Sequence, residues 1–363
     1  MARLRRRGDA AVIEPDLAGE VFDPFGGHGE TLAAALALRK RIRRAATGFD
    51  RAAAADLSRA MHLGKAACAA LWLSLAPAVF GTIVGSFNIR YDNPGDVKQG
   101  NGWQQRAPVI AGLIQFHDFD VLGTQEGFHH QMVDLCRLLP DYGCSMHGRD
   151  DGKDKGEHIG IFFKRDKYEL KEDGMFWLSE TPGTPGTGWD ASLPRICGWA
   201  KLLRKADAKE FYAFSVHLDH RGVVARKESI ALLLRKIEEI AGQTPVYLTG
   251  DFNTDQNNES YLLLKDSPRF TDAYEAAKIR YALNGTANKF DTDAKTESRI
   301  DHVFVTKGVP VRRYGVLTDS YRIPKNADPA ETKSGNFPKE VTFEDYASRL
   351  PSDHFPVLAE TED

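Results

Sequence analysis

The sequence predicts an α/β fold in which two sheets are covered by helices. Beyond Gly81, short apolar runs of strand length alternate with amphipathic stretches of helical length. Ten such runs favour two sheets rather than one. The predicted strands are residues 82–91, 119–124, 159–163, 176–178, 199–203, 211–216, 246–249, 300–305, 309–317 and 355–359.

Two stretches between these runs have the periodicity of helices with one apolar face. Residues 226–241 place Ile230, Leu233 and Ile237 on one side, and an earlier helix does the same with Ile110 and Leu113. We expect each helix to cover the outer face of a sheet.

One long irregular segment, residues 319–349, is polar and rich in Pro, Asn, Lys and Asp. Loops of that length are usually functional or disordered. We expect this loop to close over a substrate and to influence specificity.

The composition is that of a globular protein. Of 363 residues, 42% are hydrophobic and 27% charged, and 48 Lys and Arg nearly balance 51 Asp and Glu. These values exclude a disordered or collagen-like chain. Since residues 1–60 hold 11 basic and 8 acidic side chains, the remainder is mildly acidic, which argues against strong duplex nucleic-acid binding. The four cysteines form no CxxC pair, so no structural zinc site is expected.

The first 80 residues differ in composition from the main domain, residues 81–363. Residues 1–60 contain 15 alanines and two Arg-rich clusters, and we expect a poorly ordered appendage or a gene-fusion remnant. Within them, residues 21–50 resemble the cofactor-binding turn of S-adenosylmethionine-dependent DNA methyltransferases, with a chance match as the alternative. Bound S-adenosylmethionine would support methyl transfer by this segment.

Residues 61–80 have the pattern of a secretory signal peptide. A short basic start precedes thirteen uncharged residues, 66–78, which end in Ala76-Pro77-Ala78. If translation starts at Met61, the protein is expected to be secreted or periplasmic. Otherwise the segment is a buried helix or a weak anchor. Whichever start is used, we expect no stable membrane span, because the apolar stretch is too short.

Polar side chains cluster where predicted strands begin or end. Each cluster alone is compatible with a turn or a solvated surface pair. Because sheet topology can bring strand ends to one rim, we expect these side chains to converge. They are Asn88, Gln125, Glu126, His217, Asp219, His220, Asp251, Asn253, Asp301, His302, Asp353 and His354.

These residue types favour a hard divalent cation. Carboxylates, carboxamides and imidazoles without a thiolate fit Mg²⁺ or Mn²⁺ better than a closed zinc site. Magnesium takes one or two carboxylates, keeps most of its waters and shares the remaining positions with a substrate phosphate. The pattern therefore indicates phosphoryl chemistry.

The motifs SFNIR, TQE, HLDH, GDFN, IDHVF and SDHFP, in this order between about residues 82 and 360, resemble the endonuclease/exonuclease/phosphatase superfamily. FWLSETP, PRICGWAKL and DHRGVVAR are similar to a bacterial-type subgroup of uncertain substrate. The resemblance implies a four-layered α/β/β/α sandwich of two packed mixed sheets with outer helices, and a site at one end of the sheets. The implied activity is metal-dependent hydrolysis of a phosphate ester, for which we expect a phosphodiester.

The resemblance also implies roles for individual residues. Glu126 resembles the principal metal ligand, with Asn88 beside it and Asp353 as a further acidic position assigned to the metal. Asp251 and Asn253 resemble the pair that orients the attacking water and contacts the phosphate.

His217 and His354 resemble the histidines that flank the scissile phosphate, and Asp301 the residue that holds His354. We assign Asp251 as the base, His354 to electrostatic stabilisation, and His217 to phosphate binding or protonation of the leaving oxygen. His354 as the base is the alternative.

Arg195 precedes a predicted strand, where it could grip the phosphate or form a salt bridge at the strand edge. The expected partner is a phosphate ester: a nucleotide, short nucleic acid, sugar phosphate or phospholipid headgroup. We expect a monomer. The alternative is a non-catalytic module of the same fold that binds a phosphorylated ligand or a protein, which the complete set of motifs disfavours.

Overall fold

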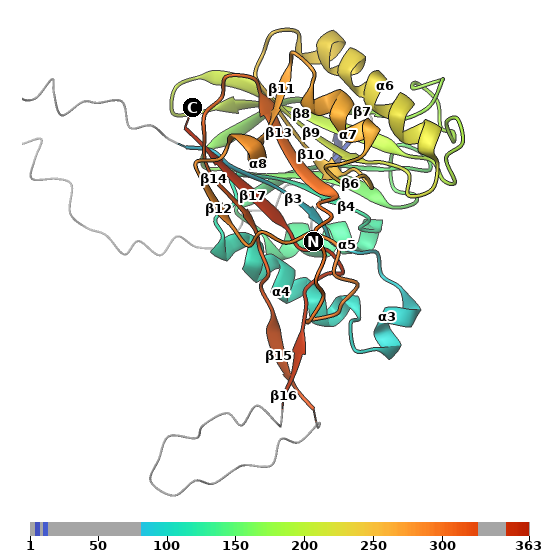
Figure 1. Ribbon diagram of the computed structural model, residues 1–363, viewed down its shortest axis with the longest axis vertical. Coiled ribbons are helices and arrows are strands. Elements are labelled where there is room, and N and C mark those ends of the chain that lie inside the picture. Colours follow the sequence, from blue (N-terminus) through green and yellow to red (C-terminus); the bar gives the residue numbers. More distant parts are fainter. Residues whose placement is uncertain (1–3, 8–9, 14–80, 326–345, 363) are drawn as a thin grey trace, which may run out of the picture. The chain divides into compact units, whose positions relative to one another are not determined.

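The computed structural model describes residues 4–7, 10–13, 81–325 and 346–362, and the fold is dominated by two large sheets (Figure 1). The seven-stranded sheet has the order β12-β14-β17-β3-β4-β6-β5 and the six-stranded sheet the order β11-β13-β10-β9-β8-β7. Both mix parallel and antiparallel pairs.

The strands of the seven-stranded sheet are β3 (Ile83–Asn88), β4 (Val121–Gln125), β5 (Tyr142–Gly148), β6 (His158–Lys164), β12 (Ile279–Tyr281), β14 (Val311–Val316) and β17 (Val357–Thr361). Those of the six-stranded sheet are β7 (Tyr168–Trp177), β8 (Ile196–Arg204), β9 (Lys209–His217), β10 (Val246–Asp251), β11 (Phe270–Asp272) and β13 (Asp301–Thr306). Two further antiparallel pairs are β1 (Leu4–Arg7) with β2 (Ala10–Ile13), and β15 (Tyr321–Pro324) with β16 (Tyr346–Arg349).

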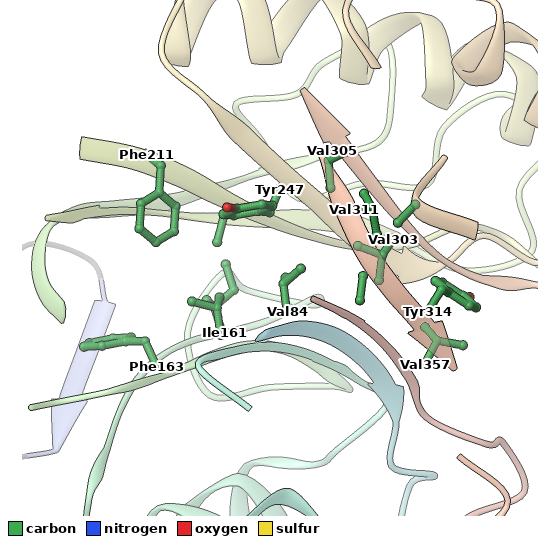
Figure 2. Packing of buried hydrophobic residues seen from close by; sticks show 14 of the residues in the cluster. Val84, Ile161, Phe163, Phe211, Tyr247, Val303, Val305, Val311, Tyr314 and Val357 are labelled. Atoms are coloured by element: carbon green, nitrogen blue, oxygen red, sulfur yellow. The ribbon is translucent and has the colours of Figure 1, made fainter. Parts of the chain in front are cut away.

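Three large apolar clusters of the described residues lie between four layers. The first fills the space between the sheets and includes Val84, Ile161 and Tyr247 (Figure 2). The second packs helices α4 (Trp103–Phe116) and α5 (His129–Leu138) on the seven-stranded sheet, and the third packs α6 (Val223–Ala241) and α7 (Glu259–Lys265) on the six-stranded sheet. The described residues therefore form an α/β/β/α sandwich, which confirms the predicted fold class.

The alternation of strand side chains explains how each sheet serves two clusters. Neighbouring residues of a strand point to opposite faces. In β6, Ile161 and Phe163 contribute to the cluster between the sheets, whereas Phe162 contributes to the cluster under the helices. All three are buried, so the strand reads as a continuous apolar run in the sequence.

Local capping fixes the short helices. Asn93 caps α3 (Pro94–Lys98), Asn258 caps α7 and Asp272 caps α8 (Ala273–Ala276), each through a side-chain oxygen that accepts from a backbone N–H. The first turn of α6 is held from another segment, since Asp190 accepts hydrogen bonds from the backbone N–H groups of Val224 and Ala225. This contact joins the chain before β8 to the start of α6.

Several boundaries differ from the sequence prediction. Strand β7 begins at Tyr168 rather than residue 176, because its middle is exposed and polar and so lacks an apolar signal. The predicted irregular segment 319–349 is wrong at its two ends, which pair as β15 and β16, while residues 326–345 lie outside the described part. Strand β5 and helix α5 were missed because Gly, His and Gln interrupt their apolar pattern.

The predictions for residues 14–80, among them the methyltransferase-like turn and the signal peptide, lie outside the described residues. Within the described part, no helix has the length and apolar character needed to cross a membrane.

Candidate active site

Strand register brings the predicted site residues to one edge of the two sheets. Asp251, the last residue of β10, pairs with His217 at the end of the parallel strand β9 and with Asp301 at the start of the antiparallel strand β13. Asn88, the last residue of β3, pairs with Gln125 at the end of the parallel strand β4. The ends of both sheets therefore meet at the same rim, as the strand-end pattern predicted.

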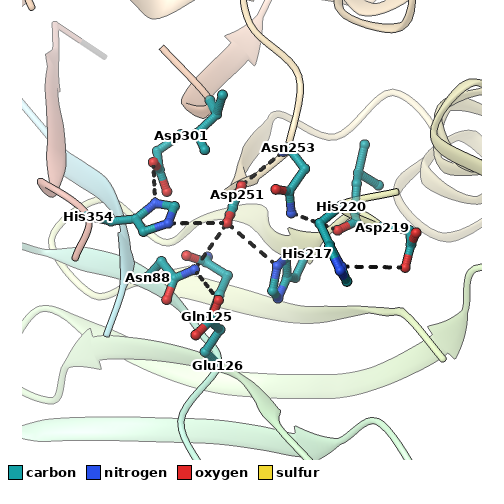
Figure 3. Close-up of polar contacts among 12 residues, drawn as sticks. Asn88, Gln125, Glu126, His217, Asp219, His220, Asp251, Asn253, Asp301 and His354 are labelled. Carbon is teal, nitrogen blue, oxygen red and sulfur yellow. Dashed lines mark hydrogen bonds and ion pairs between the residues drawn. The ribbon is translucent and has the colours of Figure 1, made fainter. Parts of the chain in front are cut away.

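Asp251 lies at the centre of the cluster, between His354 and His217 (Figure 3). The Oδ2 atom of Asp251 accepts a hydrogen bond from Asn88 Nδ2 at 3.0 Å. The Nε2 atoms of His217 and His354 lie 3.5 and 3.9 Å from the same oxygen. Asn88 Nδ2 also donates to Glu126 Oε1 at 2.9 Å. One carboxamide thus joins the two carboxylates that come from different sheets.

The backbone is strained where the site residues leave their strands. Glu126 has φ +70° and Asn253 has φ +47°, in the left-handed region that residues other than glycine rarely adopt. Asn253 is held there, because its backbone N–H donates to Asp251 Oδ1 and its Nδ2 donates to the Leu218 carbonyl oxygen. Such strain persists only where surrounding contacts over-determine the conformation.

His354 is held by a carboxylate on each side. Its Nδ1 donates to Asp301 Oδ2 at 2.8 Å, the contact that the resemblance implied. Burial by itself would lower the pKa of His354, but Asp301 and Asp251 outweigh it and raise the pKa well above its ordinary value. His354 therefore carries a positive charge at neutral pH.

The pKa of Asp251 is raised to about 7 by burial and by the neighbouring Asp301 carboxylate, against the opposing effect of His354. Only 1% of the residue is exposed. A carboxylate in this state gains strongly from a cation or a proton. That property suits either a neighbour of a metal ion or a base that works near neutral pH.

His217 differs from His354 because its close neighbour is a cation. Arg195 Nη1 lies 3.0 Å from His217 Nδ1 and 3.1 Å from His217 Nε2, and a guanidinium can only donate, so it faces the ring as a positive charge. Burial and the Arg195 charge lower the pKa of His217 well below its ordinary value. His217 is thus neutral, and its Nε2 lies 3.5 Å from Asp251 Oδ2.

Arg195 is placed beside the site rather than on an exposed strand edge. It is 4% exposed, its Nε lies 3.4 Å from Asp219 Oδ2, and its Nη2 lies 3.0 Å from His220 Nδ1. Arg195 therefore forms a salt bridge, as one of the two sequence predictions has it, and it also lies next to His217, near the place where the other prediction puts a phosphate.

Asp353 lies at the same rim, but its carboxylate contacts an arginine. Arg90 Nη1 is 3.3 Å from Asp353 Oδ2, and Arg90 Nε is 2.9 Å from Asp96 Oδ2. Burial, followed by the charge of Glu126, raises the pKa of Asp353 above its ordinary range, although His354 and Arg90 oppose this. Arg90 is the last residue of the SFNIR motif, and the sequence alone indicated no role for it.

Glu157 was missed by the sequence reasoning. Its Oε2 lies 2.5 Å from Arg149 Nη1, 3.9 Å from His217 Nδ1 and 4.0 Å from Arg195 Nη1. Burial and the Glu126 carboxylate raise the pKa of Glu157 to about 7. The available signal was the one that identified Asp301, an acidic residue directly before an apolar run.

The residues fit a divalent cation. Ligand atoms of Glu126, His217 and Asp251 lie within 4.8 Å of one another, as do those of Asp251, Asp301 and His354. The first group fits better, since His217 is neutral, whereas His354 in the second group is protonated and has no free lone pair. Glu126 and Asp251 are joined only through the Asn88 amide, which leaves their negative charge for a cation to neutralise. Asp353 belongs to neither group of the described residues.

Comparison with known proteins adds independent information. The profile of the Endonuclease/Exonuclease/phosphatase family matches residues 85–354. A solved mannosyl-6-phosphatase of Bacteroides thetaiotaomicron is 48% identical, with 77% of this chain and 99% of that chain covered and a TM-score of 0.70. An endonuclease/exonuclease/phosphatase from Bacteroides vulgatus is 36% identical, with 78% and 98% covered and a TM-score of 0.66. Among curated proteins, an uncharacterized protein of Acanthamoeba polyphaga mimivirus is 27% identical over 217 residues, which are 56% of this chain and 79% of that protein.

Proposed function

The chain belongs to the endonuclease/exonuclease/phosphatase family, and on this basis we propose that it is a divalent-metal-dependent phosphoesterase that cleaves its substrate by in-line attack of water. The observation that carries the proposal is the position of Asp251. Its buried carboxylate lies between the charged imidazole of His354 and the neutral imidazole of His217. The Asn88 amide donates to this carboxylate and to that of Glu126.

Asp251 is the proposed base. Its pKa of about 7 lies near neutral pH, where a carboxylate accepts a proton from water most effectively. Asn253, fixed against the Leu218 carbonyl beside it, would orient that water toward phosphorus. The alternative base, His354, is disfavoured because two carboxylates hold its proton.

The two histidines would act on the phosphate in different ways. His354 carries a full charge, held in place by Asp301, and would neutralise charge that grows on the phosphoryl oxygens as water attacks. His217 is neutral and would donate a hydrogen bond from Nε2 to a phosphoryl oxygen or to the leaving oxygen. Arg195, within 3.1 Å of both ring nitrogens, contributes positive charge.

Glu126, with Asn88 beside it, would hold Mg²⁺ or Mn²⁺. When bound, the ion would supply a positive charge next to the phosphate and so stabilise the transition state of in-line displacement.

The substrate class is proposed from the relative with the highest identity among those described above. Its name, mannosyl-6-phosphatase, indicates a phosphomonoester of a sugar, and its structure matches 77% of this chain. We therefore propose a sugar phosphate as the first substrate to test. The phosphodiester that the sequence analysis predicts is the second substrate class to test. Rates of hydrolysis on a phosphomonoester and on a phosphodiester distinguish the two classes.

The test is a turnover assay with p-nitrophenyl phosphate, bis(p-nitrophenyl) phosphate and mannose 6-phosphate, with and without Mg²⁺ or Mn²⁺. We expect activity that EDTA removes and added metal restores. Glu126→Gln and Asp251→Asn should each lose roughly 10²-fold to 10⁴-fold in rate. Asp266→Asn, at the exposed end of α7, is the matched control and should keep full activity. Unchanged turnover in both site variants would contradict the proposal, and a folded wild type without turnover on any ester would favour a non-catalytic module.

A further inference from the structure

The segment that follows β9 is rigid, yet it presents one side chain to solvent. The backbone N–H of Leu218 donates to the Asp251 carbonyl oxygen, and the Leu218 carbonyl oxygen accepts from Asn253 Nδ2. Asp219 Oδ1 accepts from the backbone N–H groups of Arg221 and Gly222, and the Asp219 carbonyl oxygen accepts from Arg226. Between these fixed residues, the side chain of His220 is 43% exposed.

The orientation of the His220 ring is set by Arg195. Nη2 of that buried guanidinium lies 3.0 Å from His220 Nδ1, whereas Asp219 Oδ2 is 4.0 Å from the same atom. Because the guanidinium can only donate, His220 Nδ1 accepts and the ring proton resides on Nε2. Nε2 therefore presents an N–H group on the side of the ring opposite Arg195.

His220 lies one contact beyond the residues that would surround the phosphate. The sequence of contacts runs from Asp251 to His217 at 3.5 Å, from His217 to Arg195 at 3.0 Å, and from Arg195 to His220 at 3.0 Å. Figure 3 shows His220 on the side of His217 that faces away from His354. A group attached to a phosphate near Asp251 could extend toward it.

The His220 ring is uncharged at neutral pH, since burial and the Arg195 charge both lower its pKa. A neutral, oriented N–H group is poorly suited to select an anion, but it is well suited to a hydroxyl, which both accepts and donates hydrogen bonds. The nearest charged groups, Arg195 and Asp219, both lie on the Nδ1 side of the ring.

We propose that His220 is a specificity-determining residue that donates a hydrogen bond from Nε2 to a hydroxyl of the leaving group, so that the site favours phosphate esters of sugars or related polyols. This inference rests on the proposed phosphoesterase function and deepens it, because it names the part of the substrate that is read and the residue that reads it.

The experiment compares two substrates that differ in their hydroxyl groups and in one ring oxygen: mannose 6-phosphate and cyclohexylmethyl phosphate. Both carry a six-membered ring on a primary alkyl phosphate, so their leaving alcohols have similar basicity. For His220→Ala, we expect kcat/KM on mannose 6-phosphate to fall roughly fivefold to tenfold, the value of one neutral hydrogen bond. On cyclohexylmethyl phosphate it should stay within about twofold, and His220→Gln, which keeps an N–H donor, should recover part of the loss.

His117→Ala is the matched control, because His117 follows α4, contacts Asp319 rather than a residue of the site, and should change neither substrate. Equal losses of His220→Ala on both substrates, or no loss on either, would overturn the inference. So would a wild type that hydrolyses cyclohexylmethyl phosphate as well as mannose 6-phosphate. A wild type inactive on all esters with metal present would instead overturn the proposed function, and the inference with it.

Discussion

Replacing Asp301 with Asn should move the pH dependence of hydrolysis and separate the two possible roles of His354. Asp301 is fully buried, and its Oδ2 lies 2.8 Å from His354 Nδ1. Asn keeps an acceptor oxygen at this position but removes the charge. The pKa of His354 should therefore fall, because Asp301 is the largest of the charges that raise it, ahead of Asp251 and Asp353.

The size of the effect follows from the kind of contact that is lost. A hydrogen bond between charged groups contributes about 1.5–3 kcal/mol, against about 1 kcal/mol for a neutral one. If His354 stabilises the transition state through its charge, Asp301→Asn should lower kcat/KM by roughly 10-fold to 100-fold at pH 8. The loss should shrink as the pH falls, since protonation then restores the charge of His354.

The assay is the pH profile of kcat/KM for p-nitrophenyl phosphate between pH 5.5 and 9.5 at saturating metal, for the wild type and Asp301→Asn. The descending alkaline limb should shift to lower pH in the variant. The ascending acid limb should move to lower pH as well, because Asp301 also raises the pKa of Asp251. If His354 were the base, the acid limb alone would move and the alkaline limb would stay in place. A profile that keeps its shape while its height falls would refute the reasoning for both roles.

Three further predictions concern packing, charge and thiol reactivity. Gly123→Ala should lower activity and stability together, by roughly 1–3 kcal/mol in a urea titration, because a Cβ atom on Gly123 would lie 2.8 Å from Ser215 Oγ of the facing sheet. Glu157→Gln should raise the thermal midpoint in metal-free buffer above pH 7 and leave it unchanged near pH 5, because the folded pKa of Glu157 is raised to about 7 and its ionisation therefore costs stability as the pH rises; a constant difference across this range would contradict it. Cys136 should react with iodoacetamide before Cys144, as mass spectrometry of the labelled peptides would show, since its hydrogen bond with Cys144 lowers the pKa of Cys136, whereas that contact and burial raise the pKa of Cys144; equal rates would count against this difference.

The amino-acid sequence was sufficient for the class of fold and for most of the residues that meet at the rim of the sheets. Continuous apolar runs and period-3.6 apolar patterns are local properties, so strand β6 and helix α6 could be recognised without knowledge of their neighbours. The same holds for polar residues at strand ends. Asp251 and Asp301 are 50 positions apart, yet both mark the boundary of an apolar run, and sheet pairing then places them opposite each other.

Only the tertiary structure decided which residue acts on which, and in what protonation state. Two histidines with similar sequence surroundings differ in charge, because His354 lies between carboxylates and His217 lies against Arg195. Glu157 entered the site through its contact with Arg149 and its closeness to His217, and His220 acquired a defined tautomer from an arginine 25 positions earlier. The physical reason is that a pKa depends on burial and on charges within a few ångströms, and those neighbours come from distant segments whose spacing along the chain carries no record of the contact.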